Sequence, residues 1–167
     1  MALCPGLCGA AELDRAIVYL KEADGTRIET ATLAGPAESY LVVLNDAVFS
    51  DHFLSMWPFR CIESAEKTWC HVPYPYDVQG GISEDLTDLE YDFLFVWNGK
   101  ANYGIDMWNG VFSRLEAGGA GLVGRMQEMN MNLLAVPPTA GELRPIREVD
   151  LAEADPDSHW LPRMVIR

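Results

Sequence analysis

Short runs of apolar and β-branched residues, separated by glycine, proline and Asn-Gly breaks, dominate this chain. Such runs are typical of β-strands, and no stretch longer than about ten residues keeps the period of an amphipathic helix. Through the second half of the chain the breaks recur about every 8 to 12 residues, which is the spacing of an all-β sandwich or barrel. The pattern therefore predicts a mainly β fold, a single antiparallel barrel or sandwich.

Two stretches predict hairpins residue by residue. Residues 16–33 hold Asp24-Gly25 between two runs rich in Ile, Val, Tyr and Thr, and Asp-Gly is typical of a type I′ turn. In residues 59–70 a symmetric loop centred between Ala65 and Glu66 places Cys61 opposite Cys70. Opposed residues of antiparallel strands have Cα atoms roughly 4.5 to 5.5 Å apart, within disulfide range. We therefore predict a Cys61–Cys70 disulfide in an oxidising compartment and a close thiol pair in a reducing one.

Other segments predict single elements. Residues 40–44 form a short apolar run that indicates a buried strand, and residues 47–57 predict a short helix or a capping loop ended by proline. Residues 91–97, YDFLFVW, favour a central strand because of their aromatic content. The alternation of methionine and asparagine at 129–132 is typical of a strand with one buried face. The last residues, 159–167, contain an apolar run that would close the sheet.

The amino terminus differs from the rest. Residues 1–12 are small or apolar almost throughout and lack the basic and longer apolar regions of a complete signal peptide. We interpret them as a tail that resembles the end of a targeting segment, and 13–167 as one β domain. An exported or periplasmic protein is therefore favoured over a cytoplasmic one, the alternative being an ordinary frayed terminus.

Composition and charge narrow the classes of partner. The 167 residues are 49% hydrophobic, enough for one domain with its own core. The formal net charge of −13, with 12 Lys and Arg against 25 Asp and Glu, argues against nucleic acid. No apolar run approaches the ~18 residues of a membrane span. The sequence leaves the oligomeric state open.

Reactive side chains are present, but none forms a motif for catalysis, a metal or a cofactor. His71 follows Cys70 directly, yet adjacent strand residues face opposite sides, so this histidine cannot activate that sulfur. Cys4 and Cys8 are spaced as C-x3-C, without a second such pair for a zinc site. The acidic run at 84–92 is interpreted as a charged, solvated approach to the next strand. We therefore predict structural cysteines and a His71 that faces solvent or a partner.

Aromatic residues supply the leading hypothesis for function. Small antiparallel barrels with inward aromatics often hold an apolar or aromatic ligand at one end. We predict a non-enzymatic binding module for such a ligand, whose candidate residues are Trp69, His71, Tyr74, Tyr76, Trp97, Tyr103 and Trp108.

Two other functions stay open. One is a hydrolase that uses His71 or His52 with a carboxylate, and the other is an acidic protein that docks a basic partner. The tripeptide Trp-Asn-Gly occurs twice, at 97–99 and 108–110, and is interpreted as two similar turns.

Overall fold

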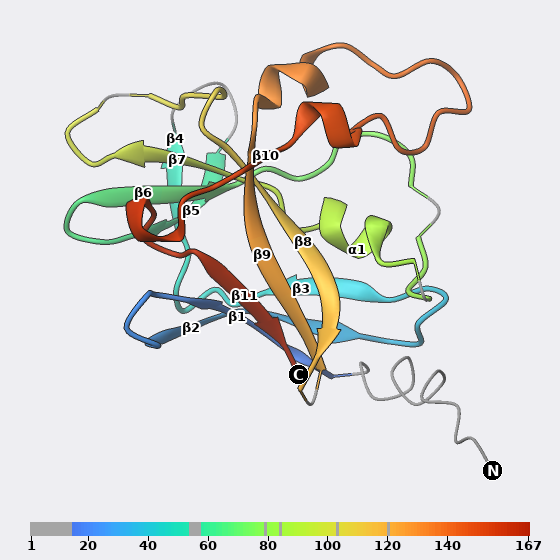
Figure 1. Cartoon of the computed structure of the whole chain (residues 1–167), viewed down its shortest axis with the longest axis horizontal. Helices are drawn as coiled ribbons and strands as arrows, with labels where there is room; N and C mark the ends of the chain where they lie inside the picture. Colours follow the sequence, from blue (N-terminus) through green and yellow to red (C-terminus); the bar gives the residue numbers. More distant parts are fainter. Residues whose placement is uncertain (1–14, 54–57, 79, 84, 103, 120) are drawn as a thin grey trace.

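The computed structural model describes residues 15–53, 58–78, 80–83, 85–102, 104–119 and 121–167. It is built from antiparallel strands, one short helix and several 3-10 turns (Figure 1). The strands are β1 Ile17–Lys21, β2 Arg27–Ala34, β3 Leu41–Leu44, β4 Ser50–Phe53, β5 Pro58–Glu63, β6 Lys67–His71, β7 Phe95–Gly99, β8 Gly110–Gly118, β9 Gly121–Met129, β10 Ala152–Glu153 and β11 Arg163–Ile166. The helix is α1 Thr87–Tyr91, and the 3-10 turns are η2 Met131–Ala135, η3 Glu148–Asp150 and η4 Pro156–Ser158.

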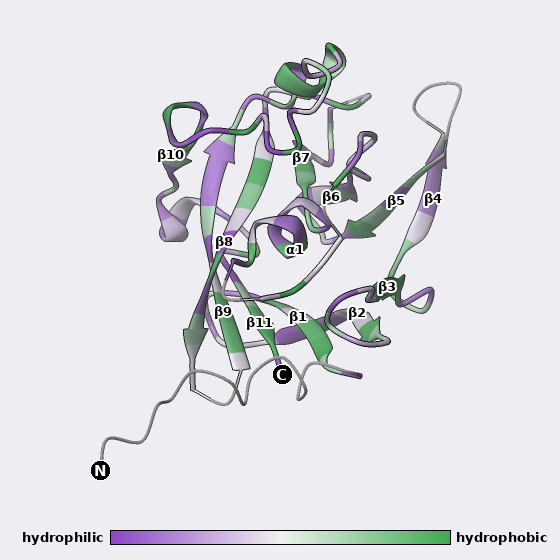
Figure 2. Ribbon diagram, turned by 90° about the vertical axis from the view of Figure 1, so that its right-hand side faces the viewer, coloured by the Kyte–Doolittle hydropathy of each residue, from purple (hydrophilic) through white to green (hydrophobic). Residues whose placement is uncertain are grey.

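All the strands belong to one sheet that curls into a half-barrel. Its order is β3-β2-β1-β11-β9-β8-β7-β6-β5-β4, and β10 pairs with β9. In Figure 2 the strands form an arc around α1, and β3 and β4 stand at the open side of that arc. The mainly β, antiparallel fold class is thus confirmed, with a curled open sheet as its form.

The connection between the two edge strands explains the curl. β3 and β4 are the two edges of the sheet but follow each other in the chain, since Leu44 and Ser50 are joined by residues 45–49. Laid flat, the ten strands of the path would be roughly 43 Å wide, whereas six residue steps reach at most about 21 Å. The sheet must therefore bend until its edges approach each other.

Each face of the sheet packs its own hydrophobic core. The larger core fills the concave face and includes Leu20, Leu33, Trp69 and Phe95. A second core lies on the opposite face of β5 to β9 and is built from the two cysteines, Tyr91, Leu94, Val96, Phe112, Met129, Met131, Leu134 and Ile146. Because strand residues alternate in direction, Trp69 and Cys70 contribute to different cores. Strands β5 to β9 are thus covered on both sides.

The first hairpin forms as predicted, but its turn is of another type. Gly25 N–H donates to the Glu22 carbonyl at 3.0 Å, and Glu22 N–H donates to the Thr26 carbonyl at 2.9 Å. Of the Asp24-Gly25 pair only Gly25 has a positive φ, of 92°. A type I′ turn needs positive φ at both central residues, so the loop instead resembles a three-residue turn that ends in a left-handed glycine. Asp24 accepts a hydrogen bond from Thr26 N–H at 2.8 Å.

Elsewhere the structure shifts or replaces several predicted elements. Within the described part of 47–57, residues 50–53 form strand β4 rather than a helix. The helix instead occupies Thr87–Tyr91, inside the acidic run, and delays the predicted central strand until Phe95. The segment Met131–Ala135 is a 3-10 turn, because Asn130 caps it through its side chain. The C-terminal strand closes the sheet as predicted, between β1 and β9.

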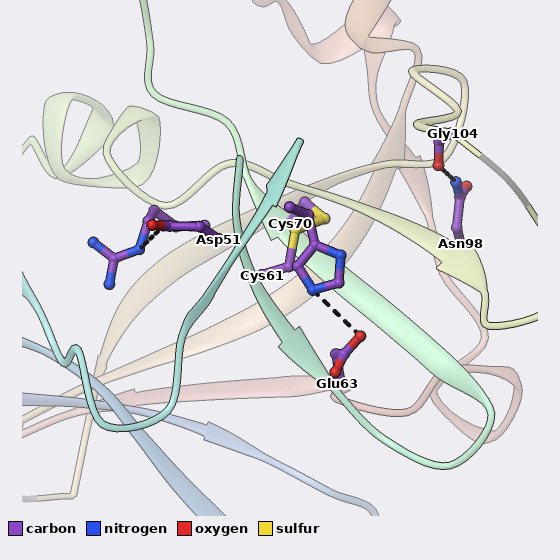
Figure 3. The surroundings of a disulfide bond; sticks show 8 residues. Asp51, Cys61, Glu63, Cys70, Asn98 and Gly104 are labelled. Atoms are coloured by element: carbon purple, nitrogen blue, oxygen red, sulfur yellow. Dashed lines mark hydrogen bonds and ion pairs between the residues drawn. A yellow bond between two sulfur atoms is a disulfide. The ribbon is translucent and has the colours of Figure 1, made fainter. Parts of the chain in front are cut away.

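The predicted register of the second hairpin is confirmed. Cys61 pairs with Cys70 across β5 and β6, their Cα atoms lie 4.0 Å apart, and their sulfur atoms are bonded (Figure 3). Both residues are buried, with exposed fractions of 0% and 4%. The bond therefore belongs to the second core and not to the surface.

Replacing both cysteines with alanine should lower the free energy of unfolding by about 2 to 3 kcal/mol, because the bond closes a short loop in the unfolded chain. Urea denaturation of the unreduced protein and of the Cys61→Ala/Cys70→Ala variant measures this difference. Peptide mapping without reduction supplies the chemical control, and a bridge from Cys61 to any other cysteine would contradict the assignment.

Candidate functional site

The predicted aromatic residues do not gather at one barrel mouth. Trp69 is 1% exposed in the concave core, where its ring contacts Phe95. Tyr74 and Tyr76 pack against each other beside the second core, on the opposite face of the sheet. Tyr103 lies outside the described residues. Among the predicted residues that the structure describes, Trp97 and Trp108 line a common hollow.

That hollow, called here the tryptophan groove, is a half-open depression of about 310 Å³. Its walls come from the centre of β7, the start of β8, the end of β9 and the segment from η3 to β10. The lining residues are Trp97, Trp108, Asn109, Gly110, Glu128, Met129, Asn130, Asp150 and Ala152. Two indoles, two carboxylates and two amides therefore share one depression.

The position of Trp97 is fixed by its neighbours. Lys67 Nζ lies 4.0 Å from the centre of its ring, and the imidazole of His159 packs edge-on at 5.7 Å. The His159 side chain is only 5% exposed, and its Nε2 lies 2.6 Å from Glu128 Oε1. Glu128 is thereby oriented by a buried histidine, while Trp108 is 69% exposed and constrained mainly by its backbone.

The two Trp-Asn-Gly segments meet at this groove. Trp97 N–H donates to the Asn109 carbonyl at 3.1 Å, and Val96 is the strand partner of Gly110. The repeat therefore marks the facing ends of two neighbouring strands and was the one sequence signal of the groove. Glu128, Asn130 and Asp150 carry no such signal, because they arrive from β9 and from a loop-like segment far along the chain.

A second hollow of about 160 Å³ lies beside the disulfide. His52 Nε2 is 3.3 Å from Glu63 Oε1, and both line this hollow with Thr68, Cys70, Asn98 and Lys100 (Figure 3). Asn98 donates to the carbonyl of Gly104. A hydrolase could find its histidine–carboxylate pair here, but the sulfur of Cys70 is already bonded and cannot act as a nucleophile.

His71, which the sequence predicts to face solvent or a partner, is half-buried and contacts other parts of the chain. Its Nε2 lies 2.8 Å from the carbonyl oxygen of Asp92, to which it donates, and its ring packs against Phe95. Burial lowers the pKa of His71, with the positive charge of Arg60 acting in the same direction and the Asp92 carbonyl opposing it. The residue is a structural contact between β6 and the end of α1.

The acidic run is partly buried, contrary to its interpretation as a solvated approach. Asp88 and Glu90 are 1% and 3% exposed. Asp88 accepts from Gly80 N–H at 3.0 Å and lies 3.6 Å from Arg144, while Glu90 accepts from Leu115 N–H at 2.8 Å. Burial raises the pKa of Glu90, and the backbone donor only partly opposes this shift.

Asp85 and Asp92 of the same run also have side-chain partners. Asp92 accepts from the hydroxyl of Tyr40, although burial raises the pKa of this carboxyl. Hydrogen bonds from Thr87 and Arg144 lower the pKa of Asp85 to about 2. We interpret the set as a charge network that anchors α1 and the segment around Arg144 to the sheet.

The described residues contain no cluster suited to a metal ion. Among the described residues no group of three or more His, Cys, Asp or Glu could hold a metal ion, and no helix there has the length and apolarity needed to cross a membrane. Comparison with known protein families, curated proteins and solved structures finds no match. The function must therefore be argued from the geometry of this chain.

Gly110→Ala should destabilise the protein and deform the tryptophan groove. A Cβ at this position would lie 2.4 Å from the Met129 carbonyl oxygen and 2.7 Å from Met131 Cγ. Relieving such a backbone contact typically costs about 1 to 3 kcal/mol. Urea denaturation measures the loss. Gly141→Ala is a control for loop glycines, since nothing lies within 4 Å of its Cβ and only its φ of 85° opposes the change. Unchanged stability in Gly110→Ala would contradict the close approach.

Acidification should lower the stability of the protein through the half-buried His71. Because its folded-state pKa is lowered, the unfolded chain takes up the proton first. Stability is therefore complete above the unfolded pKa of about 6.5 and falls as the pH drops from there toward the folded pKa. His71→Phe should lack this pH-dependent loss of stability. The difference in unfolding free energy between wild type and variant should therefore shrink from about pH 7 to about pH 5. Chemical denaturation across this range measures it, and a constant difference would contradict the assignment.

Proposed function

We propose that the protein is a non-enzymatic binding module, and that its tryptophan groove takes a small ligand with a flat aromatic or apolar body and a positive charge. The observation that carries the proposal is the 69% exposed indole of Trp108 beside the carboxylates of Glu128 and Asp150 in one depression. An exposed indole is a surface on which a flat group can stack.

The proposed site lies outside the concave core, and not at the barrel mouth that the sequence analysis suggested. Side chains of that core, such as Leu33, Trp69 and Phe95, are 1% exposed and fill the space that a barrel ligand would use. The tryptophan groove, by contrast, is open on one side and about the size of a small aromatic molecule. Binding there needs no rearrangement of the core.

Charge decides which aromatic ligands fit. An indole face attracts a cation by about 0.5 to 2 kcal/mol, depending on how far the pair is withdrawn from water. Glu128 and Asp150 line the same depression; Asp150 is paired with Arg147 at 3.4 Å, Glu128 contacts only the imidazole of His159 among the ion pairs of the described residues, and the chain as a whole carries −13. A positively charged ligand is therefore favoured over a neutral one, and an anionic ligand is opposed.

The alternative hypothesis, an acidic protein that docks a basic partner, also requires a positively charged group to bind. A lysine or arginine side chain presented by a partner would offer the groove the same positive charge. The half-open shape of the groove favours a small molecule or a single side chain, because a broad interface would need a flat surface of about 800 Å² per partner.

The test compares two probes of the same shape. Phenethylamine, which is protonated at neutral pH, should quench tryptophan fluorescence saturably, and the neutral phenethyl alcohol should bind at least about tenfold more weakly, or about 1.4 kcal/mol. Trp108→Ala should abolish the saturable change with little effect on stability, since its side chain is largely exposed.

Val136→Ala is the matched control, because Val136 is also an exposed apolar residue, at 72%, but does not line the groove. It should leave the affinity unchanged. Equal binding of the charged and neutral probes would remove the electrostatic part of the proposal. Unchanged binding in Trp108→Ala would remove the site.

A further inference from the structure

Five basic residues stand opposite one another across five neighbouring strands, although the chain is acidic. The register pairs Arg27 with Lys21, Lys21 with Arg163, Arg163 with Arg125 and Arg125 with Arg114. Directly opposed residues point to the same face of a sheet. That face is the outer one, because the adjacent Leu20 and Met164 point into the concave core. We call this set the basic row.

Such a row is costly for the sheet itself. Like charges directly opposite one another destabilise a strand pair. Carboxylates compensate one end of the row, where Arg114 pairs with Glu148 and Arg125 lies 3.7 Å from Glu153. Five of the chain's 12 Lys and Arg stand here, so the remaining surface is even more acidic than the net charge of −13 indicates.

The other end of the row, from Arg27 to Arg163, has no such compensation. Within the part of the chain that the structure describes, Lys21 and Arg163 make no ion pair at 4.0 Å or less. The guanidinium of Arg27 lies over the ring of Tyr19, at 5.9 Å from its centre, and not against a carboxylate. Three consecutive cations therefore face solvent with their charge unpaired.

A hollow of about 190 Å³ adjoins this stretch. Lys21 and Arg163 line it with Pro156 and Pro162. Two acids also line it: Asp157 is exposed, and Glu22 accepts a hydrogen bond from Trp160 Nε1 at 2.8 Å. A ligand group could therefore bind in the hollow beside two cations. The two carboxylates limit the extent of the positive surface.

We propose that the basic row is a docking surface for a short acidic peptide segment. Guanidinium groups bind carboxylates through paired, charge-assisted hydrogen bonds, and four of the five cations are arginines. The row spans four strand spacings, roughly 19 Å, which an extended peptide covers with about six residues. Alternate carboxylates of that peptide lie on one side and face the row.

The same charges disfavour a long polyanion. Glu148, Glu153 and Asp157 already stand along the row, and nucleic acid would in addition extend beyond it, over the surface of a chain whose net charge is −13. A segment of about six residues covers the row and extends no further. This surface is separate from the tryptophan groove, which favours cations, so the two proposals have opposite charge requirements.

The experiment measures fluorescence polarisation of a labelled hexapeptide with alternating glutamate and serine, at low salt where exposed charges are least screened. Arg163→Glu should weaken binding at least about tenfold. Arg15→Glu changes the net charge equally and is the control, because Arg15 is exposed near the opposite end of β1 and its backbone N–H bond to Leu33 does not need the side chain. It should leave the affinity within about twofold.

Stability separates loss of binding from loss of fold. Arg163→Glu places a carboxylate between Lys21 and Arg125, so its Tm should be no lower than that of the wild type. A lower Tm would contradict the inference that Arg27, Lys21 and Arg163 carry unpaired charge. Equal weakening by both variants, no saturable binding, or stronger competition by a single-stranded oligonucleotide than by unlabelled peptide would each overturn the proposal.

Discussion

The connection of residues 45–49 is the constraint on which the architecture depends. It joins the two edge strands of one sheet and is too short to span that sheet if flat. The connection is itself held in place, since Asn45 donates to the carbonyls of Thr30 and Glu29 and Phe49 enters the concave core. Curling follows, and with it a concave face narrow enough for side chains to fill. The groove and the basic row lie outside that filled space because no room is left within it.

Because the sheet curls, its two faces are covered differently. Over β5 to β9 the outer face carries a core of its own, covered by the segments after β6 and β9. Helix α1 contributes Leu89 to one core and Tyr91 to the other, so its acidic residues are carried into the interior with it. Their charge is tolerated because backbone N–H groups and two arginines stand beside them. On β1, β2 and β11 the outer face has no such cover among the described residues, and there the cations are exposed.

Local patterns were sufficient for part of this structure. Cys61 and Cys70 could be paired from the sequence because a symmetric loop leaves only one register, and the C-terminal strand could be recognised from its apolar run. The turn at Gly25 differed because Asp-Gly fits more than one hairpin loop. The burial of Asp88 and Glu90 could not be foreseen, because their partners Arg144, Arg114 and Leu115 are distant in sequence. For the same reason the sequence indicated only Trp97 and Trp108 among the residues that line the tryptophan groove. The basic row could be recognised only once the register of five strands was known.

The place of β11 determines the order in which the sheet can be completed. Strands β1 to β3 form one meander and β4 to β9 another, and β11, from the last residues of the chain, is the strand that pairs with both. Until it is in place, β1 and β9 each present unpaired backbone groups, and the two meanders are joined only by the short connection between β3 and β4. Such a fold has a high contact order, because its central pairing waits for residues about 140 positions apart to meet. A chain emerging from the ribosome would therefore hold two incomplete sheets with open edges until its final strand was released.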